Sequence, residues 1–278
     1  MPTFRDRLVQ AQRTTRSALC VGLDPDLERI PEHLTRSRTP EAAVEHFCRA
    51  IVEATAPVAS AYKLNFAFFE RLGDRGFAVL RRVLESIPNG RITIADAKRG
   101  DIGNSARFYA GSALHDLGFD SITVSPYMGQ DSVMPFIQDA AHAAFILVRT
   151  SNPGRTDLQD LLVEGTPLYA RVAETAMQWD AEAAGSIGFV VGASDLQAMA
   201  RIRALGPGVP FLIPGVGAQG GDPAEVLACS GHAPGLSVVN SSRGICYASP
   251  GSDFAEAAAR AARTAADALP VSPETVHG

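Results

Sequence analysis

Residues 92–102 read Ile92-Thr93-Ile94-Ala95-Asp96-Ala97-Lys98-Arg99-Gly100-Asp101-Ile102, an apolar run followed directly by charged residues. The run predicts a buried strand, so the charges lie at its end. Side-chain direction repeats every two residues along a strand, which places Asp96 and Lys98 on one face, while Gly100 lets the chain turn and carry Asp101 elsewhere. Desolvated charges are costly unless paired, so this D-x-K-x-x-D cluster is either a structural ion-pair network or a catalytic one.

Eight β-rich runs of this kind alternate with alanine-rich stretches along the chain. The runs span residues 19–23, 59–63, 92–95, 121–124, 144–148, 188–191, 211–213 and 236–239. Helices are expected between them, for example at residues 40–55, 104–117, 167–184 and 253–268. The alternation is typical of βα units around a parallel sheet, and eight units predict a (β/α)8 barrel, also called a TIM barrel. A doubly wound sheet is the alternative, but it would not bring together residues from all parts of the chain.

Composition narrows the class of protein and its partners. The 278 residues are 46% hydrophobic and contain no apolar run long enough to span a bilayer, so we expect a soluble protein without a membrane partner. The net charge of -5 and the lack of basic runs interleaved with aromatics argue against nucleic acid as a partner. The cysteines form neither a C-x-x-C pair nor a zinc-ligand cluster, which favours a reducing cytoplasm; they are Cys20, Cys48, Cys229 and Cys246.

The two ends of the chain are expected to differ in order. Phe4 and Leu8 lie one helical turn apart, which predicts a short N-terminal helix packed against the barrel. No apolar segment or small-residue cleavage site follows the arginine-rich start, so we expect no secretory signal. The tail from Pro270 to Gly278 is expected to be mobile. Residues 1–278 would then form a single barrel domain with this helix and tail.

The barrel prediction selects candidate site residues before any chemistry is considered. Active sites of (β/α)8 barrels lie at the C-terminal ends of the strands. The polar residues predicted to lie there are Asp24, Lys63, Asp96, Lys98, Ser151, Gln219 and Arg243.

A glycine-rich segment after the seventh strand reads Ile213-Pro214-Gly215-Val216-Gly217-Ala218-Gln219-Gly220-Gly221-Asp222. Its glycines let backbone N–H groups approach an anion without hindrance from side chains. The eighth strand ends in Asn240-Ser241-Ser242-Arg243-Gly244, where the arginine offers a fork suited to a phosphate dianion. A glycine-rich turn alone could be only a flexible loop, but its pairing with an arginine in the next βα unit predicts a phosphate site.

Five ordered motifs make the chain resemble orotidine 5′-phosphate decarboxylase, in its longer-chain bacterial subgroup (type 2), from about Cys20 to Tyr247. They are Val21-Gly22-Leu23-Asp24-Pro25, Tyr62-Lys63-Leu64-Asn65, the stretch from Asp96 to Ile102, Thr150-Ser151-Asn152-Pro153-Gly154, and the segment from Pro214 to Asp222. The resemblance implies decarboxylation of orotidine 5′-monophosphate to uridine 5′-monophosphate and CO2 in pyrimidine biosynthesis. It also implies that this reaction uses neither a metal nor an organic cofactor.

The resemblance also implies roles for individual residues. Lys63, Asp96, Lys98 and Asp101 would form an alternating charge array, with Asp101 contributed across a homodimer interface. Within this array Lys98 would protonate C6 of the pyrimidine, because carboxylates on both sides favour its ammonium form. The expected substrate contacts are Asp24 to the ribose hydroxyls, Ser151 to the pyrimidine edge, and Pro214, Gly217, Gln219 and Arg243 at the phosphate.

Two other functions remain open at this point. A sugar-phosphate decarboxylase or aldolase of the same barrel superfamily shares the D-x-K-x-x-D signature but works through Mg²⁺, and such relatives have an acidic residue where this chain has Lys63. A cation at that place repels a divalent metal, which favours the metal-free reaction. The chain could instead be a noncatalytic barrel that binds a phosphate ligand, but such a protein would not need the whole array.

Overall fold

The eight predicted strands close into a parallel barrel, as the sequence analysis expected. The computed structural model describes residues 2–216 and 221–272. Around the barrel the strand order is β1-β10-β9-β8-β5-β4-β3-β2, and each adjacent pair is parallel. The barrel strands are β1 (Leu19–Leu23), β2 (Ala61–Asn65), β3 (Ile92–Arg99), β4 (Ser121–Val124), β5 (Ala143–Arg149), β8 (Ser186–Val191), β9 (Phe211–Pro214) and β10 (Ser237–Ser241).

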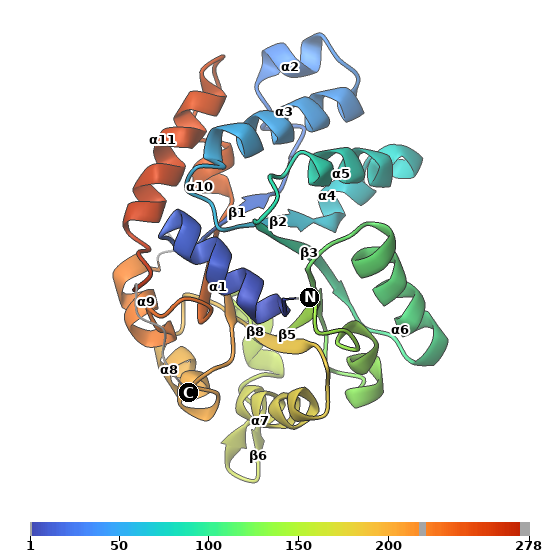
Figure 1. Cartoon of the computed structure of the whole chain (residues 1–278), viewed down its shortest axis with the longest axis vertical. Helices are drawn as coiled ribbons and strands as arrows, with labels where there is room; N and C mark the ends of the chain where they lie inside the picture. Colours follow the sequence, from blue (N-terminus) through green and yellow to red (C-terminus); the bar gives the residue numbers. More distant parts are fainter. Residues whose placement is uncertain (1, 217–220, 273–278) are drawn as a thin grey trace.

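Helices surround the barrel and cover its outer face (Figure 1). They are α1 (Phe4–Thr15), α2 (Glu32–Arg36), α3 (Pro40–Thr55), α4 (Phe66–Glu70), α5 (Gly76–Glu85), α6 (Gly103–Ala110), α7 (Leu168–Ala181), α8 (Leu196–Leu205), α9 (Pro223–Ser230), α10 (Arg243–Cys246) and α11 (Phe254–Asp267). α3 has the predicted bounds, with Thr39 as its N-cap and a proline at its first position, where the missing N–H removes no helical hydrogen bond. The helix expected at residues 104–117 is divided between α6 and a π-helical turn at Gly111–Asp116.

Strand alternation divides the apolar side chains between two cores. On β3, Ile92 and Ile94 belong to a small cluster inside the barrel, while Ala95 belongs to the large cluster between strands and helices. β1 shows the same division, because Cys20 is inside and its two strand neighbours are outside. Continuing the β3 pattern towards the strand end makes Asp96 and Lys98 the next inward positions. The alternation that fills the core therefore also directs these charges into the barrel mouth.

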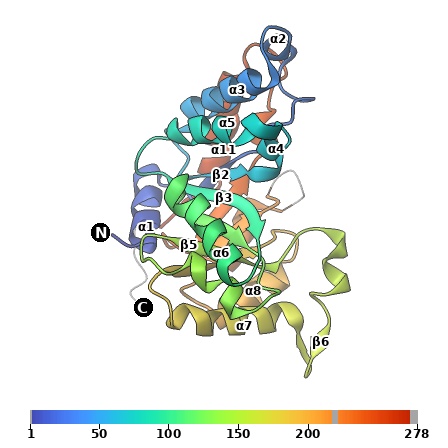
Figure 2. The same cartoon turned by 90° about the vertical axis from the view of Figure 1, so that its right-hand side faces the viewer.

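The helix packed against the barrel that Phe4 and Leu8 predicted is α1, and it closes the end of the barrel opposite these charges. Both side chains are fully buried, and the Phe4 ring meets the Phe145 ring of β5 edge to face at 6.1 Å between centroids. Thr3 caps the helix, with its side chain accepting a hydrogen bond from the Asp6 N–H. Figure 2 shows α1 at one end of the barrel and the β6–β7 hairpin projecting at the other. The site is thus restricted to the end that α1 leaves open.

The connections after β1 and β5 contain secondary structure of their own. The segment after β1 includes α2, and the segment after β5 includes the antiparallel hairpin of β6 (Leu162–Val163) and β7 (Thr166–Pro167).

At the C-terminal end, Pro270 pairs with Ser17 and the Ser272 N–H donates to the carbonyl of His232. Residues 270–272 of the tail that was expected to be mobile are thus held by backbone contacts, and residues 273–278 lie outside the described residues. Within residues 2–216 and 221–272, no helix is both long enough and apolar enough to cross a membrane.

Candidate active site

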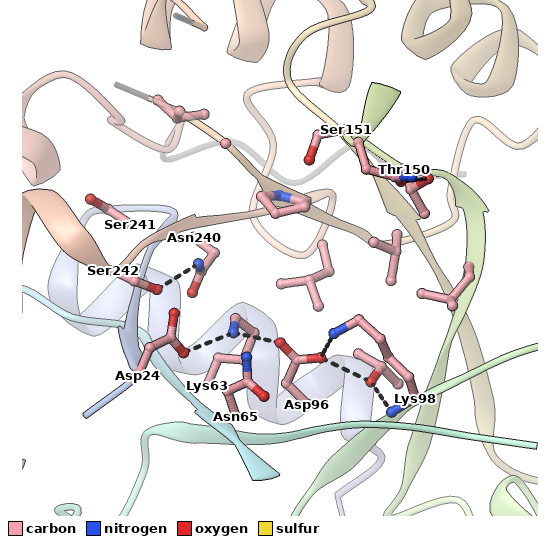
Figure 3. A pocket seen from close by; sticks show the side chains of 18 of the residues that line it. Asp24, Lys63, Asn65, Asp96, Lys98, Thr150, Ser151, Asn240, Ser241 and Ser242 are labelled. Atoms are coloured by element: carbon pink, nitrogen blue, oxygen red, sulfur yellow. Dashed lines mark hydrogen bonds and ion pairs between the residues drawn. The ribbon is translucent and has the colours of Figure 1, made fainter. Parts of the chain in front are cut away.

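A cavity of about 480 Å³ opens at the C-terminal ends of the barrel strands. This volume suits a small organic ligand. The lining residues come from all eight βα units and include Asp24, Lys63, Asn65, Asp96, Lys98, Thr123, Thr150, Ser151, Val190, Pro214, Gly215, Asn240, Ser241, Ser242 and Arg243. Figure 3 shows four charged side chains in a row along one wall and Thr150 with Ser151 on the other.

The row of charges joins three strands through ion pairs. Lys63 Nζ on β2 lies 2.7 Å from Asp96 Oδ2 and 3.6 Å from Asp24 Oδ1. Lys98 Nζ donates to the other carboxylate oxygen of Asp96. The Lys63 and Asp96 side chains are only 6% and 9% exposed, so water screens their attraction poorly. The array therefore presents fixed charges inside a largely desolvated site.

Burial and pairing act against each other on the pKa values of this array. Burial alone would raise the pKa of Asp96, but Lys63 and Lys98 lower it more, to about 2. Burial alone would lower the pKa of Lys63, but Asp24 and Asp96 raise it above its ordinary value. Both groups are consequently charged at neutral pH.

Lys98 lies at an irregular point of β3. The β3–β4 register shifts between Ala95 and Arg99, and Lys98 has a φ of 46°, in the left-handed region that residues other than glycine seldom adopt. The Lys98 N–H donates to Thr123 Oγ1 at 2.9 Å, and that hydroxyl donates to Asp96 Oδ1 at 3.3 Å. Thr123 therefore holds both the strained backbone and the carboxylate, which is typical of strain kept at a functional site.

The predicted phosphate end is formed by the segments after β9 and β10. Pro214, Gly215 and Arg243 line the cavity, and Gly215 has a φ of 96°, which favours glycine. Arg243 is exposed, and its guanidinium has no hydrogen bond or ion pair to any residue in 2–216 or 221–272. Gly217 and Gln219, which the resemblance assigns to phosphate, lie outside the described residues.

Partly buried polar contacts hold the loop after β5. Gln159 accepts from the Thr150 N–H at 3.0 Å and donates to the Thr150 hydroxyl at 2.8 Å. The buried Arg149 guanidinium bridges Asp160 at 2.6 Å and Asp195 at 2.7 Å. These contacts fix the backbone that presents Ser151 to the cavity.

Asp101 does not lie among the residues that line the cavity. Its carboxylate accepts a hydrogen bond from the Ile102 N–H at 2.8 Å, at the start of α6. The structure of one chain thus brings together Asp24, Lys63, Asp96, Lys98, Ser151, Pro214 and Arg243, but leaves Asp101 outside.

Thr123 and Asn240 line the cavity but were not predicted as site residues from the sequence. The alternation of Ser121, Ile122, Thr123 and Val124 could have placed Thr123 inside, because Ile122 and Val124 pack in the outer core. A stronger signal was also available for the array itself. The chain has 23 arginines but only two lysines, Lys63 and Lys98, and both lie in this cavity. All the other Lys/Arg positions of the chain are arginine, which indicates that these two positions require an ammonium group.

A (β/α)8 barrel with a Lys–Asp–Lys array around a buried carboxylate, and an arginine at the predicted phosphate end, defines a class of enzyme that acts on small phosphate esters. The sequence pattern of the orotidine 5′-phosphate decarboxylase / HUMPS family matches residues 17–261. The chain belongs to this family.

Individual relatives extend the match over nearly the whole chain. A protein of Herpetosiphon aurantiacus named orotidine 5′-phosphate decarboxylase is 47% identical over 262 residues, 94% of this chain and 95% of its own. One of Variovorax paradoxus with the same name is 45% identical, covering 96% of this chain and 98% of its own. The solved structure of Leishmania donovani OMP decarboxylase superposes with a TM-score of 0.81 at 38% identity, over 96% of this chain and 98% of that one.

Proposed function

We propose that the protein decarboxylates orotidine 5′-monophosphate to uridine 5′-monophosphate and CO2, in the biosynthesis of pyrimidine nucleotides. The observation that carries this proposal is the charge array, in which Lys98 and Lys63 contact the two oxygens of one buried carboxylate, Asp96. The relatives of similar length that carry the decarboxylase name support the same conclusion.

Loss of CO2 from C6 of the pyrimidine leaves a carbanion without an obvious electron sink, so the barrier must be lowered by an amount near the top of the usual range of ~8–23 kcal/mol. Lys98 supplies a preoriented positive charge beside C6 and then donates the proton that completes uridine 5′-monophosphate. Asp96 faces the departing carboxylate and orients Lys98. Lys63 keeps Asp96 ionised and close.

The remaining contacts hold the substrate at its other groups. Asp24 binds ribose, Ser151 binds the pyrimidine edge, and Arg243 with the segment containing Pro214, Gly217 and Gln219 binds phosphate. Phosphate lies far from the reacting carbon, so its binding energy can be used to close the site and exclude water. The reaction then needs neither a metal nor an organic cofactor.

The active unit is a homodimer in which Asp101 completes the partner's array. Lys98 supports this assignment because its side chain is 53% exposed, leaving room for a second carboxylate. Large apolar side chains are exposed near Asp101, as expected of a face that another chain covers; they are Ile102 at 51%, Phe108 at 73% and Tyr127 at 87%. Four free cysteines, three of them buried, are compatible with the cytoplasmic location that we propose for this dimer.

A magnesium-dependent sugar-phosphate decarboxylase or aldolase is the competing enzyme. Lys63 argues against it, since its ammonium lies 2.7 Å from Asp96 and occupies the place beside that carboxylate where a divalent cation would have to bind. A noncatalytic phosphate-binding barrel would gain nothing from the strained backbone of Lys98.

The test is to supply purified protein with orotidine 5′-monophosphate in EDTA and to follow the pyrimidine absorbance. We expect the absorbance change of decarboxylation, with uridine 5′-monophosphate as the product by chromatography. A parallel sample receives a keto-sugar phosphate and Mg²⁺. Turnover only in that sample would support the competing enzyme, and turnover in neither would support the noncatalytic barrel.

A further inference from the structure

Two buried oxygen atoms in the cavity wall have no hydrogen-bond donor among residues 2–216 and 221–272. They are Asp24 Oδ1 and Asn240 Oδ1. The Asn240 residue is only 7% exposed, so it is more than nine-tenths buried. A buried acceptor without a donor costs about 1–3 kcal/mol, so such an atom in a binding cavity calls for a donor from the ligand.

The Asn240 amide is held in one orientation. Its Nδ2 donates to Ser242 Oγ at 3.2 Å, and Figure 3 shows this contact beside the charge array. The amide nitrogen is therefore turned towards Ser242, and the oxygen is the atom left without a partner.

Gly22 provides the space for this arrangement. A Cβ at Gly22 would lie 2.8 Å from Asn240 Oδ1 and 1.9 Å from Ser242 Oγ, closer than nonbonded atoms approach. Gly22 is also the strand partner of Lys63, so the two side chains lie over β1 next to the array. The absence of a side chain at Gly22 therefore lets Asn240 and Ser242 occupy this part of the cavity wall.

We infer that Asn240 is a substrate-binding residue that accepts a hydrogen bond from one hydroxyl of the ribose, while Asp24 accepts from the neighbouring hydroxyl. Asn240 Oδ1 has no donor among the described residues, and Asp24 Oδ1 has only the Lys63 ammonium at 3.6 Å, beyond hydrogen-bond distance. The two acceptors come from adjacent βα units at one wall, which matches the two donors of a cis-diol. The inference rests on the proposed function, because it takes the nucleotide as the ligand. It adds Asn240 as a determinant of ribose against deoxyribose.

The test compares wild type with Asn240→Ala on orotidine 5′-monophosphate and on its 2′-deoxy and 3′-deoxy analogues. Removing a neutral hydrogen bond should lower kcat/KM for the ribose substrate about 3- to 15-fold. Wild type should lose a similar factor on the analogue that lacks the hydroxyl bound by Asn240. On that analogue, Asn240→Ala and wild type should have the same kcat/KM. On the other analogue, the loss from the missing hydroxyl and the loss from Asn240→Ala should multiply.

A structural role for Asn240 predicts something different, namely the same fold-loss on all three substrates, and that result would overturn the inference. Ser242→Ala provides a second variant that leaves the amide in place but removes its orienting partner. It should show the same selective pattern with a smaller loss, and it decides the matter if Asn240→Ala does not fold. If wild type did not turn over orotidine 5′-monophosphate, the proposed function itself would be wrong. If wild type turned it over but Asn240→Ala lost the same factor on all three substrates, only the inference about Asn240 would be wrong.

Discussion

The surroundings of Lys63 shift its pKa, and this pKa can be measured directly. Its pKa is raised because two carboxylates outweigh the effect of burial. A raised lysine pKa means that its contribution to stability is complete below the ordinary value of 10.5 and is lost as the pH rises through the folded-state value. For Asp96 the sign is opposite, since its contribution is present above 3.8 and is lost as the pH falls towards about 2.

The first prediction is that the Lys63 ammonium does not titrate below pH 10.5. Because the chain has two lysines, protein labelled with ¹³C-lysine should give two Cε signals, assigned with Lys98→Arg. The Lys63 signal should keep its ammonium chemical shift throughout this range. A midpoint below 10.5 would show that burial outweighs the two carboxylates.

Arg243 gives a second prediction at the scale of one side chain. Arg243→Ala should lower kcat/KM for orotidine 5′-monophosphate by about 1.5–3 kcal/mol in transition-state binding, because a charge-assisted contact to phosphate is lost. Turnover of orotidine, which lacks phosphate, should be unchanged. The matched control is Arg263→Ala, which removes an exposed arginine of α11. Equal losses on both substrates would assign Arg243 to the fold instead.

At the scale of elements, β3 explains which parts of the site could be predicted from the sequence. Strand alternation was sufficient to place Asp96 and Lys98 on the same face, because the pattern depends only on local geometry. The bulge at Lys98 could not be foreseen, since it depends on a hydrogen bond to Thr123 from another strand. The position of the Asn240 amide oxygen could not be predicted for the same reason, because it depends on the absence of a side chain at Gly22 on a different strand.

The loop after β5 leads to a third prediction. Gln159→Ala removes both hydrogen bonds to Thr150, so Ser151 should lose its fixed position at the cavity. We expect about a tenfold fall in kcat/KM, with the free energy of unfolding changed by about 1–2 kcal/mol. Gln10→Ala, which removes a surface contact on α1, is the control. If both variants retained wild-type kcat/KM, the loop would not depend on Gln159.

For the whole molecule, the barrel could be predicted because each βα unit carries its own signal, and eight units leave few ways to close a sheet. The place of Asp101 could not be derived from one chain. Asp101 does not line the cavity of its own chain, so the site role that we propose for it requires a second chain.

The fourth prediction tests this assembly by complementation. Asp101→Ala and Lys98→Ala subunits should each be inactive, but a mixed dimer has one site with both native residues. Equal mixing with free exchange should therefore restore about one quarter of wild-type activity, since half the dimers are mixed and each has one complete site. Mixed dimers verified by mass that stay inactive would contradict shared sites.

The central claim is that Lys98 supplies both the preoriented charge and the proton for decarboxylation without a metal. The most direct measurement is kcat/KM for orotidine 5′-monophosphate in EDTA, together with the Kd for uridine 5′-monophosphate, for wild type, Lys98→Ala and Lys98→Arg. We predict that both variants lose at least about 10²- to 10⁴-fold in kcat/KM, because arginine keeps the charge but does not release a proton, while the product still binds. Near-normal turnover by Lys98→Ala would contradict the claim.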